Sequence, residues 1–302
     1  MAKDISRRKF IAQGTAGLAA IGLLSSGTAD RKPSLTPTRT LGKTGLTVPT
    51  ICFGATRISE DSVLRYAIDN GLTFLDTGRA YANGNNEKMI GRVVSGFRDD
   101  VIIQSKIRLE PKDIPSGSDS RKGEGEILTV LSRRLEESLR ALATDHIDIL
   151  LYHDAAEESL LFHRTVTDFF SSKKAEGIIR AFGFSTHNDC LHLPERNNRE
   201  GIYELMMLPF NYRGSYVHSI NKTYSEWDQE RLLSILQAAH EKNIGFIAMK
   251  TCSAGPYLKD DGAEASYPAA VTWVLDHDFV TSAAVAMANY SEIDDYLKAF
   301  SH

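Results

Sequence analysis

Short apolar runs recur along the chain from residue 50 onwards, and each is followed by a stretch whose apolar residues repeat at helical spacing. Runs of this kind, rich in β-branched and aromatic residues, are typical of β-strands. The predicted strands cover residues 50–54, 73–77, 101–106, 147–153, 181–186, 203–210, 244–250 and 281–287. The predicted helices cover residues 62–70, 86–95, 125–142, 159–175, 190–197, 226–242, 267–276 and 291–300. The pattern is therefore a strict alternation of strand and helix.

Eight strand-then-helix units over about 250 residues are the count and length of a closed parallel (β/α)8 TIM barrel, which is the α/β fold predicted here. A doubly wound open sheet would also alternate, but no GxGxxG follows the first predicted strand. Residues 39–50 precede the first unit and place Gly42 and Gly45 between apolar positions. We expect this segment to form a small hairpin that caps the bottom of the barrel.

Composition narrows the classes of function. The chain has 302 residues, 42% of them hydrophobic and 25% charged, as in ordinary globular proteins. A net charge of −4 without a basic stripe argues against a nucleic-acid partner. The 3 cysteines contain no CxxC pair, so a disulfide framework or a cysteine-based metal cluster is not expected.

The first 29 residues have the features of an export signal rather than of a folded domain. Paired Arg7 and Arg8 precede Phe10 and a weakly apolar run, and small residues at Gly27 and Ala29 suit a signal peptidase. The segment resembles a twin-arginine signal peptide, which implies the twin-arginine export machinery as a partner and a periplasmic or otherwise exported location. The alternative is an amphipathic anchor helix that stays attached. Residues 30–38 are predicted to be a linker and residues 39–302 the barrel, with no stable membrane anchor after cleavage.

Polar residues stand where the predicted strands end, and the carboxyl ends of barrel strands are where TIM-barrel enzymes place their chemistry. These strand-end residues are Asp76, Lys106, His153, Ser185, His187, Asn211 and Lys250, and Tyr81 follows in the loop after the second strand. We expect Asp76, Tyr81, Lys106 and His153 to converge. The ammonium of Lys106 beside the phenol would stabilise the phenolate and should lower the pKa of Tyr81. The carboxylate of Asp76 should hold that ammonium, and His153 can bind a carbonyl oxygen.

The motifs "LGKTGLTVP", "FGATRIS", "FLDTGRAYANGNNEKMIG", "IIQSK" and "DILLYH" follow one another in the order and spacing of the aldo-keto reductase superfamily, which residues 39–300 resemble. The resemblance implies an NADP(H)-dependent oxidoreductase, with NAD also possible, and a catalytic tetrad of Asp76, Lys106, His153 and the general acid Tyr81. It further implies that Ser185 and Asn211 bind the nicotinamide amide and that Phe210 stacks on the nicotinamide ring.

The chain departs from the family's pattern where the nucleotide should bind. Met207 stands where the family usually has Gln, and Asp295-Tyr296 stand where it has Glu-Asn. Asn289 and Ser291 can cap the last helix and face the cofactor, but no arginine follows them. Lys250 either holds a pyrophosphate or forms a salt bridge at the barrel mouth. Residues 107–124 and 212–228 are predicted to be the loops that close over the site.

Three hypotheses remain open from the sequence. The first is an exported NADP(H)-dependent reductase of a small aldehyde, ketone or keto-sugar. The second is a barrel without redox chemistry that serves as a binding module, since the nucleotide region departs from the pattern. The third is a cofactor-independent isomerase or lyase that uses Tyr81 and His153 as an acid–base pair. No metal site is predicted.

Overall fold

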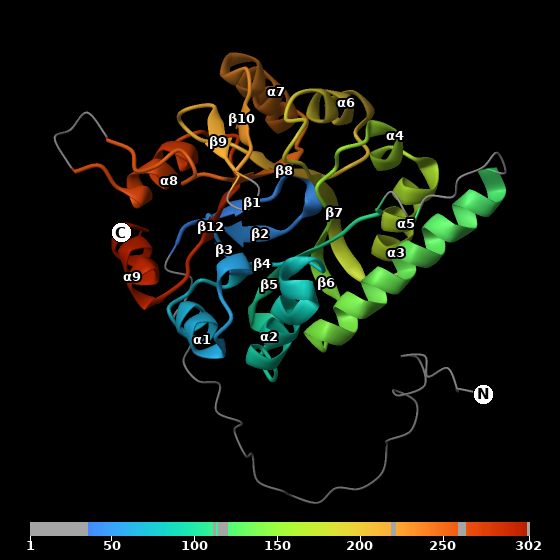
Figure 1. Cartoon of the computed structure of the whole chain (residues 1–302), viewed down its shortest axis with the longest axis horizontal. Helices are drawn as coiled ribbons and strands as arrows, with labels where there is room; N and C mark the ends of the chain where they lie inside the picture. Colours follow the sequence, from blue (N-terminus) through green and yellow to red (C-terminus); the bar gives the residue numbers. More distant parts are fainter. Residues whose placement is uncertain (1–35, 111–112, 114–119, 219–221, 259–263, 301–302) are drawn as a thin grey trace, which may run out of the picture. The chain divides into compact units, whose positions relative to one another are not determined.

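The computed structural model describes residues 36–110, 113, 120–218, 222–258 and 264–300. Its centre is a closed barrel of parallel strands, in the order β3-β4-β5-β6-β7-β8-β11-β12, with β12 pairing back onto β3 (Figure 1). The strands are β3 (Ile51–Gly54), β4 (Phe74–Asp76), β5 (Ile102–Ile107), β6 (Ile147–Tyr152), β7 (Ile179–Ser185), β8 (Leu205–Pro209), β11 (Gly245–Met249) and β12 (Ser282–Ala286). The predicted (β/α)8 barrel is confirmed. The predicted signal peptide and residues 30–35 of the predicted linker lie outside the described residues.

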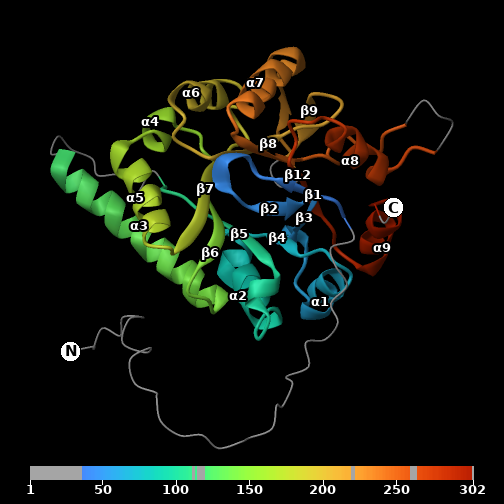
Figure 2. The same cartoon turned by 180° about the vertical axis from the view of Figure 1, so that it is seen from behind.

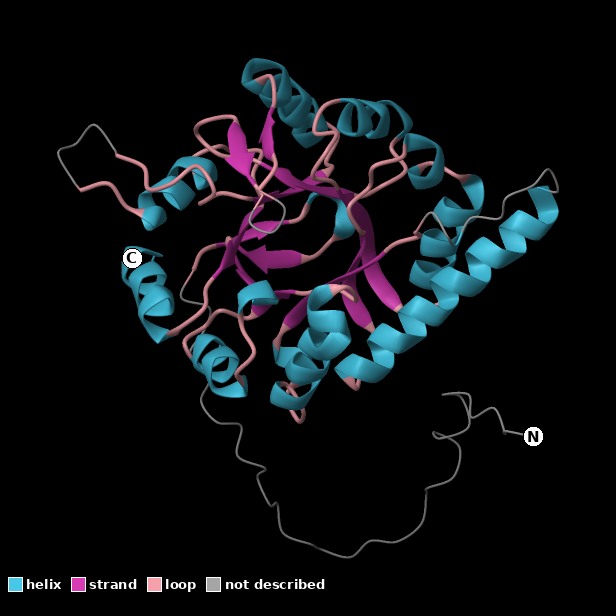
Figure 3. Cartoon of the chain, viewed as in Figure 1, coloured by secondary structure: helices cyan, strands magenta, loops and turns pink. Residues whose placement is uncertain are grey.

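Helices surround the ring of strands, as Figure 3 shows in cyan around magenta. They are α1 (Asp61–Asp69), α2 (Asn85–Val93), α3 (Ser120–Leu142), α4 (Glu158–Leu161), α5 (Arg164–Ala175), α6 (His192–Glu200), α7 (Gln229–Glu241), α8 (Tyr267–Leu275) and α9 (Tyr290–Phe300). None of the helices in the described part of the chain is long and apolar enough to cross a bilayer.

At two of the helix boundaries that differ from the prediction, side chains cap the backbone locally. The helix expected over residues 159–175 is interrupted after α4, because His163 adopts an extended conformation. The ring of His163 accepts from the backbone N–H of Thr165 and thereby caps the start of α5. The helix expected from residue 226 begins at Gln229, where Asp228 accepts from the N–H of Arg231. Immediately before it, β10 (Tyr224–Glu226) pairs with β9 (Ser215–Val217).

Alternation along the strands builds two separate apolar layers. In β6, Ile149 and Leu151 point into the barrel, whereas Leu150 joins the layer between strands and helices. Because the interior is filled by side chains of this kind, the barrel is a packed core, and a ligand must bind at one of its ends.

The amino-terminal end of the barrel is closed by the hairpin of β1 (Thr38–Thr40) and β2 (Thr47–Pro49), as expected from the sequence (Figure 2). Leu41, fully buried, belongs to the interior cluster. The hairpin is fixed by the N–H of Lys43, which donates to the carbonyl of Asn243 at 2.6 Å, directly before β11. Gly42 is required there, because its φ is +50° and a Cβ would lie 2.4 Å from the nitrogen of Gly245. The opposite end is left for function.

The hairpin contributes to stability through its buried leucine. We expect Leu41→Ala to lower the free energy of unfolding by about 2–5 kcal/mol, because the cavity it leaves lies in the packed interior. Leu128→Ala, at a leucine that is 43% exposed, is the matched control and should change it by less than about 1 kcal/mol. Urea denaturation of both variants measures the difference, and equal effects would contradict this role for the hairpin.

Candidate active site

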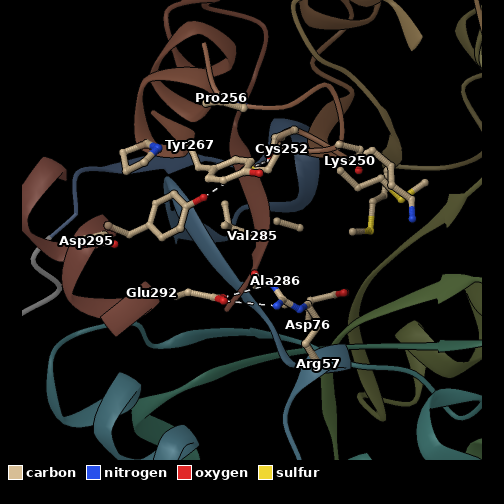
Figure 4. A pocket seen from close by; sticks show the side chains of 18 of the residues that line it. Arg57, Asp76, Lys250, Cys252, Pro256, Tyr267, Val285, Ala286, Glu292 and Asp295 are labelled. Atoms are coloured by element: carbon tan, nitrogen blue, oxygen red, sulfur yellow. Dashed lines mark hydrogen bonds and ion pairs between the residues drawn. The ribbon is translucent and has the colours of Figure 1, made fainter. Parts of the chain in front are cut away.

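A cavity of ≈ 1360 Å³ lies at the carboxyl end of the barrel strands (Figure 4). Its inner part is lined by Asp76, Tyr81, His153, Met207 and Met249, which follow or end strands of the barrel. It extends outward along α8 and α9, where Tyr267, Glu292, Asp295, Tyr296, Lys298 and Ala299 line it. The cavity therefore joins three of the predicted catalytic residues, Asp76, Tyr81 and His153, to the region where a nucleotide was expected.

Lys106 and Asp76 form a buried ion pair at the base of this cavity. Lys106 Nζ lies 2.5 Å from Asp76 Oδ1, and the two side chains are 1% and 5% exposed. The ammonium also donates to the carbonyl of Thr77 at 2.7 Å and to the phenol oxygen of Tyr81 at 3.1 Å, so each of its three N–H groups has an acceptor. Burial alone would lower the pKa of Lys106, but Asp76 and Tyr81 outweigh it and raise that pKa to about 12. Lys106 is therefore charged throughout the neutral range.

Gln104 supports the pair and was missed by the sequence analysis. Its Nε2 donates to Asp76 Oδ1 at 2.6 Å and contacts the sulfur of Met207 at 3.4 Å. The signal that could have identified it is its spacing, because residues two apart on a strand point to the same side. Gln104 therefore points into the barrel with Lys106. Both residues that bind the Asp76 carboxylate thus come from β5, the strand next to that of Asp76.

Tyr81 opens a 3₁₀ turn, Tyr81–Gly84, whose Ala82 and Asn83 have left-handed φ values of 48° and 53°. This loop is tied to the barrel by a buried carboxylate: Glu87 accepts from the hydroxyl of Ser105 at 2.6 Å and pairs with Arg79 at 2.7 Å. Glu87 thus ties the segment around Tyr81 to β5, the strand that carries Lys106.

The pKa of Tyr81 shifts in the direction opposite to that expected from the sequence. Burial raises it above its ordinary value, and the ammonium of Lys106 lowers it by less than burial raises it. Tyr81 is therefore a protonated phenol at neutral pH. Since its oxygen already accepts from Lys106, its own O–H is available to donate to a ligand in the cavity.

His153 lies beside the phenol, with ring centroids 5.8 Å apart and the planes at 74°. Burial, and then the positive charges of Lys106 and Arg108, hold the pKa of His153 well below its ordinary value. The ring is thus a neutral hydrogen-bonding group. Asp76, Tyr81, Lys106 and His153 converge as expected, and the arrangement can hold a carbonyl oxygen and give it a proton.

The residues expected to bind the nicotinamide are placed elsewhere. Phe210 is fully buried in the layer outside the barrel, with its ring centroid 5.3 Å from that of Trp273 of α8, and it does not line the cavity. The amide of Asn211 donates to the carbonyls of Ser215 and Lys250 and accepts from the N–H of Arg213. Ser185, 1% exposed, accepts from the N–H of Asp154. Ser185 and Asn211 hold loops together at the cavity rim, and neither lines it. Met249 lines the cavity instead, although it resembles an ordinary core residue in the sequence.

At the outer end of the cavity, Asn289 caps α9 as expected, because its side chain accepts from the N–H of Glu292 at 2.9 Å. Neither Asn289 nor the exposed Ser291 lines the cavity. Glu292 does, and it pairs with Arg57 at 3.1 Å. Lys250, Thr251 and Ser253, which follow β11, also line the cavity. In the described residues, no group of histidine, cysteine and carboxylate side chains is arranged to hold a metal ion.

The chain belongs to the aldo/keto reductase family: the sequence profile of the Aldo/keto reductase family matches residues 51–268. This confirms the resemblance inferred from the motifs. The chain is 33% identical to methylglyoxal reductase YeaE of Escherichia coli over 43% of this chain and 39% of that protein. It is 26% identical to a D-threo-aldose 1-dehydrogenase of a Pseudomonas species over 70% of this chain and 68% of that protein. The match to YeaE spans less than half of that relative's length.

Solved structures share the fold. The aldo-keto reductase AKR11C1 from Bacillus halodurans, in its holo form, superposes with a TM-score of 0.68 over 87% of this chain and 90% of that chain, at 18% identity. An aldo-keto reductase from Klebsiella pneumoniae solved in complex with NADPH gives a TM-score of 0.63 over 88% and 91%, at 21% identity. At these identities the likeness establishes the barrel architecture.

The cavity histidines should make stability fall in acid. In the folded protein the pKa of His153 lies well below 6.5, and burial, Lys250 and His218 lower that of His187 to about 3. The unfolded chain therefore binds more protons as the pH falls from 6.5 towards 3, and the free energy of unfolding falls with it. We expect the Tm of His187→Asn to decline less steeply than that of the wild type between about pH 7 and pH 4.5. His192→Asn, at an exposed histidine of α6, is the control and should follow the wild type; parallel slopes for all three would refute this account.

Proposed function

We propose that the protein is an NADP(H)-dependent oxidoreductase that reduces a small aldehyde, ketone or keto-sugar, or catalyses the reverse oxidation, with Tyr81 as the general acid. The observation that carries the proposal is the ammonium of Lys106, held by Asp76, donating to the oxygen of Tyr81 at 3.1 Å. That contact directs the phenol's own proton into the cavity and stabilises the phenolate left after the proton is given up. Family membership supports the same reaction class, as do the activities for which two relatives are named, methylglyoxal reductase and D-threo-aldose 1-dehydrogenase.

The cavity suits a dinucleotide together with a small substrate. Its volume of ≈ 1360 Å³ exceeds the range of about 300–1,000 Å³ that is usual for a single drug-sized ligand. The hydroxyls of Thr251 and Ser253 and the guanidinium of Arg57 are the groups along its length that would hold phosphate oxygens. When bound, the nicotinamide supplies the hydride, and the protein supplies placement and the proton. The family's NADPH complex supports NADP as the nucleotide.

The residues of this chain then have distinct tasks. His153, as a neutral ring, hydrogen-bonds the carbonyl oxygen and orients it towards Tyr81. Tyr81 would give its proton to the carbonyl oxygen as negative charge develops there. Lys106 stays charged and stabilises the phenolate until solvent returns a proton. In the oxidation the same phenolate accepts the alcohol's proton.

Removing the phenol oxygen should separate chemistry from binding. We expect Tyr81→Phe to lower kcat for aldehyde reduction by about 10²–10⁴-fold, because the proton donor is lost, while the Kd of NADPH changes by less than about twofold. Tyr66→Phe, which removes a phenol oxygen bonded to Asp294 outside the cavity, is the control and should keep wild-type kcat. Steady-state kinetics and a fluorescence titration of NADPH and NADH, each measured separately, provide both numbers.

If neither NADPH nor NADH binds, the proposal is contradicted, and the non-redox binding module and the cofactor-independent isomerase or lyase remain as hypotheses. Turnover of a sugar without added nucleotide would favour the isomerase.

We also propose that the protein is exported by the twin-arginine machinery and acts in the periplasm or beyond the cell membrane. This proposal is supported by the sequence alone. Replacing Arg7 and Arg8 together by lysine should retain the full-length precursor in the cytoplasm, because that machinery reads the arginine pair. Cell fractionation followed by immunoblotting measures the distribution. Lys9→Arg in the same segment is the control and should be exported. Export of the double variant at the wild-type level would refute the proposal.

A further inference from the structure

One side of the cavity carries a lysine and two histidines that the proposed chemistry does not use. Lys250, His187 and His218 line this side together with His153. His187 and His218 lie with ring centroids 6.0 Å apart, and His187 packs 6.3 Å from Tyr216, whose hydroxyl donates to the His187 carbonyl. Lys250 Nζ lies over the Tyr216 ring, 5.4 Å from its centroid. We refer to Lys250, His187 and Tyr216 as the basic corner.

Lys250 differs from Lys106 in what its ammonium touches. Lys106 donates to Asp76, Thr77 and Tyr81. Lys250 Nζ has neither a hydrogen bond nor an ion pair within the described part of the chain, and it lies over the Tyr216 ring. Burial lowers the pKa of Lys250, and Asp154 acts in the opposite direction. The carboxylate of Asp154 is itself paired with Arg108 at 3.1 Å.

The backbone at Lys250 is held in an uncommon conformation. Its φ is +58°, in the left-handed region that residues with a side chain seldom adopt. The turn is fixed because the Lys250 carbonyl accepts from Asn211 Nδ2 at 3.2 Å and from the N–H of Ser253 at 3.0 Å. Conformations of this kind cluster at functional sites, where surrounding contacts maintain them. Asn211 therefore contributes to the position of Lys250 at the cavity wall.

We propose that the substrate carries an anionic group, a carboxylate or a phosphate, and that Lys250 binds it. A half-buried ammonium without an acceptor is costly, and an anion entering the cavity would supply the missing partner. His187 adds a second donor or acceptor, since its Nδ1 is buried and has no partner in the described residues. The inference rests on the proposed function, and it names the class of its substrate.

The alternative partner of Lys250 is the pyrophosphate of the nucleotide, which the sequence analysis gave as one of its possible roles. The position of the basic corner favours the substrate. Both Lys250 and Lys106 depress the pKa of His187, and His187 in turn depresses that of His153. Lys250 therefore lies within electrostatic range of the reacting end of the cavity, whereas Arg57 and Glu292 lie at its α9 end.

Two matched substrate pairs test the proposal at saturating NADPH: 4-carboxybenzaldehyde against 4-formylbenzamide, and glyceraldehyde 3-phosphate against glyceraldehyde. We expect the wild type to prefer the anionic member of at least one pair in kcat/KM. Lys250→Met should reduce that preference by about 10- to 100-fold, the range of a hydrogen bond to a charged group. Lys250→Arg should restore most of it. The pair that responds distinguishes carboxylate from phosphate.

Lys298→Met is the matched control, because Lys298 lines the same cavity from α9. It should leave the anionic preference at the wild-type value. An equal loss for both members of each pair in Lys250→Met, with a raised Kd of NADPH, would assign Lys250 to the nucleotide and overturn the proposal. An unchanged preference would overturn it as well.

If no carbonyl compound is turned over, the proposed function fails, and calorimetric titration of 4-carboxybenzaldehyde and glyceraldehyde 3-phosphate still tests the anion site. Binding of either by the wild type that weakens at least tenfold in Lys250→Met would retain the site. The absence of binding, or equal binding by the two proteins, would reject it.

Discussion

Lys106 and Asp76 form a charge pair that is almost fully shielded from water, and the rest of the site is arranged around it. Removing one partner of a buried pair typically costs about 3–5 kcal/mol, because the other charge is left uncompensated. Gln104 also donates to Asp76 Oδ1, and the carbonyl of Thr77 accepts a second N–H of the ammonium. The third N–H of the ammonium is thereby directed to Tyr81, so the position of the phenol and the direction of its proton both follow from this pair.

Burial decides the protonation states on which the proposed chemistry relies. It keeps Tyr81 protonated despite the adjacent ammonium, and it keeps His153 neutral. A protonated phenol beside a neutral imidazole is ready to give a proton to a carbonyl oxygen. Burial also lowers the pKa of Lys250, but the described part of the chain provides no acceptor for that ammonium, and in this Lys250 differs from Lys106.

The nucleotide end of the cavity is built differently from the pattern that the motifs implied. Glu292 lines the wall and is paired with Arg57. Phe210 and Asn211, which the motifs associated with the nicotinamide, serve the layer outside the barrel and the turn at Lys250. Motif position alone could not reveal this, because the orientation of a side chain at a strand end depends on the loop that follows it.

The sequence by itself determined the barrel and the four converging residues. Strand and helix periodicities are local properties, and the carboxyl ends of parallel strands necessarily meet at one end of the barrel, so Asp76, Lys106 and His153 had to be neighbours. Only the tertiary structure decided the pKa direction of Tyr81, the exclusion of Phe210 from the cavity, and the roles of Gln104 and Lys250. Those depend on which atoms exclude water and which hydrogen bonds are already occupied, and both are set by residues far apart in the chain.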